Sequence, residues 1–336
     1  MKIRPVMRGL LTFVPGVQSH LPMRGTRTSV SASYYYGVWL KHLTLLWANG
    51  VRSIPRTFAE LGPGDALGVG LAALLSGATR YYALDVVRYS NIPATLKVLD
   101  EMIELFRTRA PKPAKGFPNV DAYLGPDLFP HHILTEELLA RSLAPERIAS
   151  IREIAEHRDR PGAVSIKYMV PWTDASVIET NSVDLLLSHS VLEHVVDLEA
   201  VHRSIHRWLK PNGVMSHQID FTAHGLSSKW NGYRAYSELL WKFILGRRPF
   251  LINREPCSAH ELHVKNQGFD LICSMKNYRR DGIQRSELSR HWKDISDDDL
   301  ICCGAFIQAR KPPEATDERG QAMSASQAPV HASSGA

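Results

Sequence analysis

The sequence predicts an α/β fold: a doubly wound, mostly parallel sheet of seven strands with helices on both faces. Two observations lead to this class. Short runs rich in β-branched and aromatic residues alternate with segments of helical periodicity, which indicates βαβ units. The chain has 336 residues, of which 44% are hydrophobic and 22% charged, and this is enough for one large domain with a sizeable core.

The strands are expected at 56–61, 80–86, 163–170, 183–189, 214–221, 266–278 and 297–311. Helices are expected between them, at about 66–76 and 93–108 among others. Before the sheet, "SASYYYGVWLKHLTLLWANG" (31–50) repeats apolar residues at helical spacing and stops at Asn49 and Gly50. We expect an N-terminal amphipathic helix there, laid on a Rossmann-like sheet domain.

Domain boundaries follow from composition. Residues 1–50 form a basic segment with its helix, and 51–311 form the sheet domain, interrupted by insertions at about 109–160 and 222–256. The tail 312–336 is rich in Pro, Ser, Ala and Gln, so we expect it to be disordered.

Charge is concentrated at the start of the chain. The net charge is +6, and residues 1–56 hold eight Lys or Arg and no acid. Such a segment fits a solvated basic face, a mitochondrial-type presequence, or a peripheral contact with an anionic membrane. We expect no nucleic-acid partner, because no second folded recognition domain is evident. The sequence assigns no oligomeric state.

Location is inferred from apolar runs and cysteines. No run approaches the roughly 18 apolar residues of a membrane span, and the first residues lack the pattern of a secretory leader. The four cysteines form no CxxC pair and read as buried thiols of a reducing compartment: Cys257, Cys273, Cys302 and Cys303. We therefore expect a cytoplasmic protein.

A glycine turn follows the first strand, in "FAELGPGDALGVGLAALL" (58–75). Gly62 and Gly64 allow a sharp turn and a close approach of backbone to ligand, and Asp65 can cap the next helix. In a doubly wound sheet the ligand lies at the carboxyl ends of the strands. Asp85 ends the second strand, where an acid can accept both hydrogen bonds of a ribose diol.

The details of this turn favour one nucleotide over another. The dinucleotide fingerprint G-x-G-x-x-G requires a third glycine where Leu67 stands, with Gly68 displaced by one. Glu60 would repel a pyrophosphate but can pair with an ammonium group. The turn therefore suits a nucleoside that carries an amino acid better than NAD.

Downstream, "NSVDLLLSHSVLEHVVDLEAVHRSIHRWLKPNGVM" (181–215) gives a strand, a tight crossing, a helix and a Lys-Pro-Asn-Gly stop. With the acidic-Gly-x-Gly turn and the acid after the second strand, this resembles the class I S-adenosylmethionine-dependent methyltransferases, in particular the type 11-like group. The resemblance covers about 56–220. It implies a methyltransferase enzyme with S-adenosyl-L-methionine as cofactor.

The resemblance also implies site residues. The expected cofactor contacts are Glu60, Gly62 and Gly64 at the methionine part, Asp85 at the ribose, Val86 and Met169 at the adenine, and His189 and Ser190 beside the sulfonium. The acid that usually ends the third strand is missing here. Its place falls to Tyr168 or Met169 through backbone groups, or to Asp174 from the loop.

Catalytic candidates lie in and after the fifth strand. An acceptor of low nucleophilicity needs a base, and Asp220, His224 and His217 are available. Alternation along the strand places His217 and Asp220 on opposite faces, which favours Asp220 and His224. His189, Glu193 and His194 are spaced H-x-x-x-E-H, which matches no zinc motif, so no metal site is expected.

Two segments are expected to cover the site. The tyrosines 34–36 could close over the cofactor. The insert 222–256 carries Trp230, Tyr233, Tyr236, Trp241, Arg247 and Arg248, which suit a small-molecule or glycan-type acceptor but also an ordinary helical lid. Two other functions stay open: a cofactor-binding protein without catalysis, and an NAD-dependent oxidoreductase.

Overall fold

The computed structural model describes residues 3–14, 31–113, 116–124, 128–158, 160–172, 174–248 and 251–313. Its seven strands form one sheet in the order β3-β2-β1-β4-β5-β7-β6. They are β1 (Thr57–Leu61), β2 (Arg80–Leu84), β3 (Ser165–Met169), β4 (Val183–His189), β5 (Leu209–Asp220), β6 (Asp270–Tyr278) and β7 (Cys302–Arg310). The first five strands pair in parallel, and β7 runs antiparallel to both β5 and β6. The predicted fold class is confirmed.

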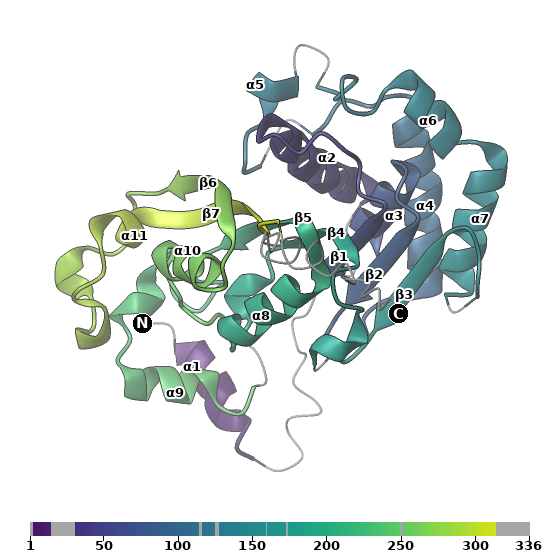
Figure 1. Ribbon diagram of the computed structural model, residues 1–336. Helices are drawn as coiled ribbons and strands as arrows, with labels where there is room; N and C mark the ends of the chain where they lie inside the picture. Colours follow the sequence, from purple (N-terminus) through teal and green to yellow (C-terminus); the bar gives the residue numbers. More distant parts are fainter. Residues whose placement is uncertain are drawn as a thin grey trace, which may run out of the picture.

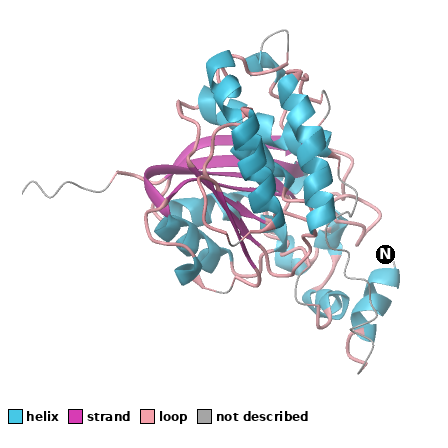
Figure 2. Cartoon of the chain, turned by 90° about the vertical axis from the view of Figure 1, so that its right-hand side faces the viewer, coloured by secondary structure: helices cyan, strands magenta, loops and turns pink. Residues whose placement is uncertain are grey.

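Helices cover both faces of the sheet, and Figure 2 shows the strands between two groups of helices. The helices are α1 (Ile3–Leu11), α2 (Ala32–Ala48), α3 (Gly68–Leu75), α4 (Ile92–Arg107), α5 (Asp121–Leu124), α6 (Glu136–Ser142), α7 (Pro145–Glu156), α8 (Leu198–Trp208), α9 (Glu238–Leu245), α10 (Cys257–Asn266) and α11 (Asp297–Ile301).

Two hydrophobic cores hold these layers together. On one face, α2, α3, α4 and α7 pack against the β1–β2 side of the sheet through buried residues such as Trp39, Leu71 and Phe106. On the other face, α8 and α10 pack against β4, β5 and β7, with Trp208 and Met215 fully buried. Figure 1 shows α2 and α4 on one side of the strands and α8 and α10 on the other.

Helix α2 differs from the predicted amphipathic helix. Every residue from Tyr35 to Leu46 is buried, including Lys41 and His42. The side chains of these two are satisfied inside the protein: Lys41 Nζ donates to the carbonyl of Gly116 at 2.8 Å, and His42 Nδ1 lies 2.7 Å from Ser216 Oγ. The helix is enclosed because the first insertion, which carries α5, covers the side that faces away from the sheet.

Two other local predictions need adjustment. Residues 1–30 have no clear periodicity in the sequence, yet Ile3–Leu11 form α1, which packs on α9. Strand β5 begins at Leu209, five residues before the expected 214, because Leu209 pairs with Val183 ahead of the Lys-Pro-Asn-Gly turn. Of the expected disordered tail 312–336, residues 314–336 lie outside the described part of the chain.

Candidate active site

The candidate site lies where the strand order reverses. From β1 the chain proceeds outward to β2 and β3, and it then returns to β4 and β5 on the other side of β1. In doubly wound sheets ligands bind outside the carboxyl ends of the strands at this switch point. The glycine turn after β1, Asp85 after β2 and His189 at the end of β4 therefore meet at one edge.

The glycine turn has the backbone shape that the sequence requires. Gly62 and Gly64 have φ values of +66° and +73°, in the left-handed region that favours glycine. A Cβ on Gly62 would also lie only 2.5 Å from Val191 Cγ2. The predicted cap was wrong: Leu67, with φ +52° and no side-chain cap bond, precedes α3. Asp65 instead accepts a hydrogen bond from the Tyr35 hydroxyl at 3.2 Å.

Two glycines inside α3 explain why glycine is displaced from the dinucleotide pattern. A Cβ on Gly68 would lie 2.2 Å from the ring of Tyr35, and one on Gly70 would lie 2.0 Å from the ring of Tyr81. Both glycines therefore let an aromatic ring press against the helix. Sequence reasoning missed these contacts, although the pair Gly68 and Gly70 so early in a helix was a signal that a packing partner comes close.

Glu60 lies beneath the turn rather than in it. Its side chain is 3% exposed and accepts a hydrogen bond from the Tyr81 hydroxyl at 2.6 Å. Burial raises its pKa to about 8, while hydrogen bonds from Tyr81 and from the backbone of Gly70 act in the opposite direction. The structure thus directs Glu60 towards α3 and Tyr81, and its contact with the cofactor, as the resemblance implied, stays a prediction.

Asp85 stands at the end of β2 as expected. It is 8% exposed, and burial raises its pKa, partly offset by the backbone N–H groups of Val86 and Val87. Both of these groups donate to Oδ1, at 2.7 and 3.4 Å, so Oδ2 can accept from a ribose hydroxyl. Val86 is 52% exposed beside it. The fit to the cofactor is good at this position.

The end of β3 offers three candidates for the place of the missing acid, and the choice among Tyr168, Met169 and Asp174 stays a prediction. The carbonyl of Met169 accepts the backbone N–H of Asp85 at 3.2 Å, which places Met169 next to the expected ribose site. The Tyr168 hydroxyl is used elsewhere, as acceptor for the backbone N–H groups of Tyr89 and Ser90. Asp174 accepts from the N–H of Ser176 at the start of a short 3₁₀ turn.

His189 and Ser190 end β4 beneath the first turn of α2. His189 Nδ1 lies 3.3 Å from His42 Nε2, and burial lowers the pKa of His189 to about 3, so its ring is neutral. The ring of Tyr34 meets it edge-on with centroids 6.0 Å apart. Ser190, with φ +57°, donates to Gln218 Oε1 at 2.8 Å. The beginning of α2 therefore reaches this edge of the sheet, as predicted for the tyrosines.

A second group of side chains follows β4 and β5. His224 Nε2 lies 3.5 Å from Asp220 Oδ2 and 4.0 Å from Glu193 Oε1. The rings of His194 and His224 meet edge-on at 5.0 Å. Burial raises the pKa of Glu193 and lowers that of His194 to about 4. We call Glu193, His194, Asp220 and His224 the β4–β5 cluster.

His217 does not join this cluster. Its side chain is 1% exposed, its Nδ1 lies 2.8 Å from Ser188 Oγ, and its ring faces His202 at 6.2 Å between centroids. The alternation along β5 that favoured Asp220 is visible here, because His217 points into the core under α8. A role of His217 in proton transfer to an acceptor at the strand ends has no geometric support.

The aromatic residues of the second insertion mostly face inward. Tyr233, Tyr236, Trp241 and Ile244 are buried together in a small core of their own. The Tyr233 hydroxyl donates to the carbonyl of Phe221 at 2.9 Å, which ties this core to the end of β5. Arg248 instead donates to carbonyls at the end of α9, and Arg247 lies over Phe13. The insertion thus packs against the carboxyl end of β5 through its aromatic residues, and Arg247 and Arg248 take no part in that contact.

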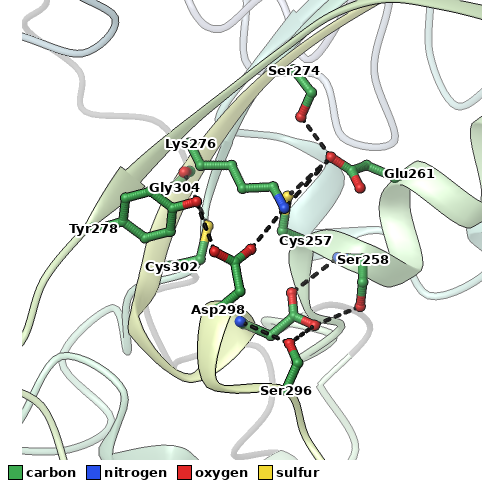
Figure 3. Close-up of polar contacts among 11 residues, drawn as sticks. Cys257, Ser258, Glu261, Ser274, Lys276, Tyr278, Ser296, Asp298, Cys302 and Gly304 are labelled. Carbon is green, nitrogen blue, oxygen red and sulfur yellow. Dashed lines mark hydrogen bonds and ion pairs between the residues drawn. The ribbon is translucent and has the colours of Figure 1, made fainter.

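Cys257 and Cys302 lie in another polar region, shown in Figure 3, where α10, β6, β7 and α11 meet. All four cysteines are free thiols: Cys257, Cys302 and Cys303 are buried and Cys273 is partly buried. Beside Cys257 and Cys302, Lys276 Nζ lies 2.8 Å from Asp298 and 3.8 Å from Glu261. These contacts link the C-terminal strands to α10 and α11 and lie apart from the β4–β5 cluster.

Comparison with known proteins gives one family match. Residues 131–216 match the model of a methyltransferase domain, and no curated protein matches the chain. Among solved structures, phosphoethanolamine N-methyltransferase 2 of Haemonchus contortus, in complex with S-adenosyl-L-methionine, is 16% identical with a TM-score of 0.41. The match covers 85% of this chain and 58% of that chain, so this chain spans less than two thirds of its length.

Two further structures show likeness at a similar level. A putative sarcosine dimethylglycine methyltransferase from Galdieria sulphuraria is 14% identical, with 82% of this chain and 85% of that chain covered and a TM-score of 0.41. An S-adenosylmethionine dependent methyltransferase from Mesorhizobium loti is 13% identical, with 79% and 95% covered and a TM-score of 0.39. The family match over residues 131–216 agrees with the resemblance to methyltransferases predicted from the sequence.

Proposed function

We propose that the chain transfers the methyl group of S-adenosylmethionine to a small-molecule or glycan-type acceptor by in-line displacement. One observation carries the proposal. The positive-φ glycine turn, Asp85 and Ser190 converge at the switch point, and the β4–β5 cluster follows the neighbouring strand ends. A nucleoside site and a set of proton-accepting groups thus share one edge of the sheet.

The roles of this chain's residues follow from their positions. Gly62 and Gly64 let the backbone approach the amino-acid part of the cofactor, and Asp85 accepts from the ribose hydroxyls. The cofactor supplies a methyl group on a sulfonium. Asp220, 3.5 Å from His224 Nε2, orients the imidazole, which takes the proton from an acceptor hydroxyl. The start of α2 and the second insertion exclude water from the two sides.

Calorimetry with S-adenosylhomocysteine, and separately with NADH, tests the cofactor. We expect saturable binding of the first ligand and none of the second; the reverse result would establish an oxidoreductase. Turnover is then followed as release of S-adenosylhomocysteine with pools of sugars, nucleotide sugars and small alcohols. The variant Asp220→Asn should bind S-adenosylhomocysteine like the wild type and lower kcat by about 10²–10⁴. Binding without turnover of any acceptor would favour the non-catalytic alternative.

We also propose that α1 and α9 form a surface that contacts an anionic membrane. No helix within the described residues is long and apolar enough to cross one. The two helices pack together, since a Cβ on Gly9 would lie 1.9 Å from the carbonyl oxygen of Phe243. Their outer side exposes Ile3, Met7, Leu10, Leu11, Leu239 and Phe243. We call these six residues the α1–α9 patch.

Basic residues surround the α1–α9 patch. Arg4 and Arg8 of α1 are exposed, as are Lys242 of α9 and Arg247 just after it. The chain has no acid before Glu60. Apolar side chains bordered by arginines are typical of helices that lie in the interface of an anionic bilayer. The packing of α1 on α9 favours a part of the folded protein over a cleaved presequence.

Co-sedimentation with phosphatidylcholine vesicles, with and without phosphatidylserine, tests this surface. We expect binding that requires the anionic lipid, falls with salt, and is lost in Leu239→Asp. Leu262→Asp is the matched control, because Leu262 is similarly exposed, at 56% against 65%, but lies on α10. Equal binding by both variants, or by neutral vesicles, would refute the proposal.

A further inference from the structure

The β4–β5 cluster brings together residues that the sequence separates. Glu193 and His194 form a 3₁₀ turn directly after β4, and His224 follows β5 about thirty residues later. One ligand-type atom from each of these three residues lies within 4.8 Å of the others. Asp220 adds a carboxylate oxygen 3.5 Å from His224 Nε2. Two imidazoles and the Glu193 carboxylate therefore surround one point, with the Asp220 carboxylate beside His224.

Glu193 is the unusual member of this group. It is 2% exposed, and both of its carboxylate oxygens are buried without a hydrogen-bond partner of normal geometry. A buried carboxyl group in this state costs free energy unless a ligand completes it.

An ion pair with His224 does not account for this arrangement. A protonated His224 would satisfy Asp220 at 3.5 Å, but Glu193 lies at 4.0 Å and makes no hydrogen bond with it. Such an ion pair also does not involve His194, whose ring meets that of His224 edge-on. A divalent cation uses Glu193, His194 and His224 at once, because imidazole and carboxylate are its protein ligands.

The backbone around the cluster is held in place. Asn253 from the second insertion donates its side-chain amide to the carbonyls of Leu192 and Val195, at 2.8 and 2.9 Å. Its backbone N–H donates to the carbonyl of Glu193 at 2.6 Å. His224 has a left-handed backbone, with φ +46°, and its side chain is 29% exposed. Asn253 thus holds the turn that carries Glu193 and His194, and the partly exposed His224 allows a ligand to enter the cluster from solvent.

We propose that Glu193, His194 and His224, with Asp220 as a fourth ligand, bind a divalent transition-metal ion such as Zn²⁺. Two imidazoles and one or two carboxylates are a donor set typical of zinc, and the ligand atoms need to close in by about 1 Å to reach its coordination distances. The spacing of His189, Glu193 and His194 does not indicate this site, because His224 lies about thirty residues further along the chain and His189 pairs with His42 instead. If the chain methylates a hydroxyl as proposed above, a bound metal would take over the activation of that hydroxyl from the free His224 imidazole, by lowering the pKa of the hydroxyl. Metal binding itself does not rest on that proposal.

The test uses the full chain without an affinity tag, dialysed against a chelator. Titration with Zn²⁺ in a calorimeter should show one ion bound per chain. The variants His194→Ala and His224→Ala should each weaken binding by more than about tenfold. His157→Ala is the control, because His157 is an exposed histidine at the end of α7. No uptake by the wild type, or equal affinity in all three variants, would overturn the proposal.

A second measurement avoids the folding of variants. Co²⁺ added to the wild type should give the intense visible absorption of a four-coordinate site, and Zn²⁺ should abolish it by displacement. A weak spectrum typical of hexaaquo Co²⁺ would overturn the proposal. Binding of S-adenosylhomocysteine, measured with and without Zn²⁺, separates a failure of the metal proposal from a failure of the proposed function. It depends on the proposed cofactor site and not on this cluster.

Discussion

Two buried glutamates at the same edge of the sheet differ in how they are satisfied. Glu60, in β1, is 3% exposed and receives the Tyr81 hydroxyl at 2.6 Å. Glu193, just after β4, is 2% exposed and has no hydrogen-bond partner for either oxygen. Burial raises the pKa of both. One carboxyl group belongs to the packing of the protein, and the other is left available to a ligand.

The surroundings of the two residues extend the contrast. Near Glu60, rings press directly on glycines of α3, as Tyr81 does on Gly70. Near Glu193, both Ser190 and His224 hold left-handed backbone conformations without being glycine, and on the β1 side Leu67 does so as well. Such strain is found at functional sites, where the surrounding structure maintains it. We therefore expect changes on the β1 side to affect stability first, and changes on the β4–β5 side to affect ligands first.

The largest effect is expected for Gly70→Val. Its Cβ would lie 2.0 Å from the ring of Tyr81, and neither the helix nor the buried ring can move aside cheaply. We expect the free energy of unfolding, measured in urea, to fall by about 3 kcal/mol or more. Gly162→Ala is the control, because its Cβ would come no closer than 3.4 Å to any atom outside its chain neighbours. Equal stability of the two variants would mean that the β1 side is not densely packed.

Removing the Asp85 carboxylate should act on the cofactor. Asp85→Ala is expected to weaken binding of S-adenosylhomocysteine by about 1.5–3 kcal/mol, the scale of hydrogen bonds to a charged group. This corresponds to roughly a 10- to 150-fold rise in Kd, measured by calorimetry. Asp174→Ala is the control, since Asp174 only caps a short exposed turn. If Asp174→Ala bound S-adenosylhomocysteine more weakly than Asp85→Ala, Asp174 and not Asp85 would be the acid that contacts the cofactor.

The pH dependence of stability tests the state of Glu60. Its pKa is about 8 in the folded protein against an ordinary 4.5, so between these values the folded chain holds a proton that the unfolded chain has lost. The free energy of unfolding must then fall as pH rises through this window, by about 1 kcal/mol between pH 6 and pH 7. Glu60→Gln cannot lose that proton, so it should lack this part of the slope. Parallel slopes for wild type and variant would show that Glu60 is ionised when buried.

The features that the sequence predicts correctly depend on neighbouring residues, and the features that it misses depend on residues far apart in the chain. The order of strands, the turn at Gly62 and the acid at Asp85 are local patterns, and the structure has them where expected. The cap at Asp65 was wrong because Tyr35, thirty residues away, takes its carboxylate. The meeting of His224 with Glu193 depends on β4 and β5 lying side by side in parallel. Such a contact can be predicted only from the order of the strands in the sheet, which the hydrophobic periodicity of the sequence does not indicate.

Helix α2 shows the same limit in another way. Its apolar positions predicted the helix correctly, but an amphipathic helix has an exposed side, and here every residue from Tyr35 to Leu46 is buried. The partners of Lys41 and His42, which are Gly116 and Ser216, come from an insertion and from β5. Whether a polar residue on a helix is buried depends on whether a later segment of the chain packs against that side of the helix. The sequence therefore predicts which residues form a helix or strand, but it does not predict which faces of that helix or strand are exposed.

The smallest effect, and the finest test of the comparison, is expected at Val86. It follows Asp85 directly and is 52% exposed, so its side chain contributes little to the core. If it packs on the adenine as the resemblance implies, Val86→Ala removes two methyl groups that are half covered by the ligand. We expect a loss of about 0.5–1 kcal/mol in the binding of S-adenosylhomocysteine and no change in the unfolding midpoint. A loss of stability with unchanged affinity would place Val86 on the structural side of the edge, with Glu60, and would move the adenine away from β2.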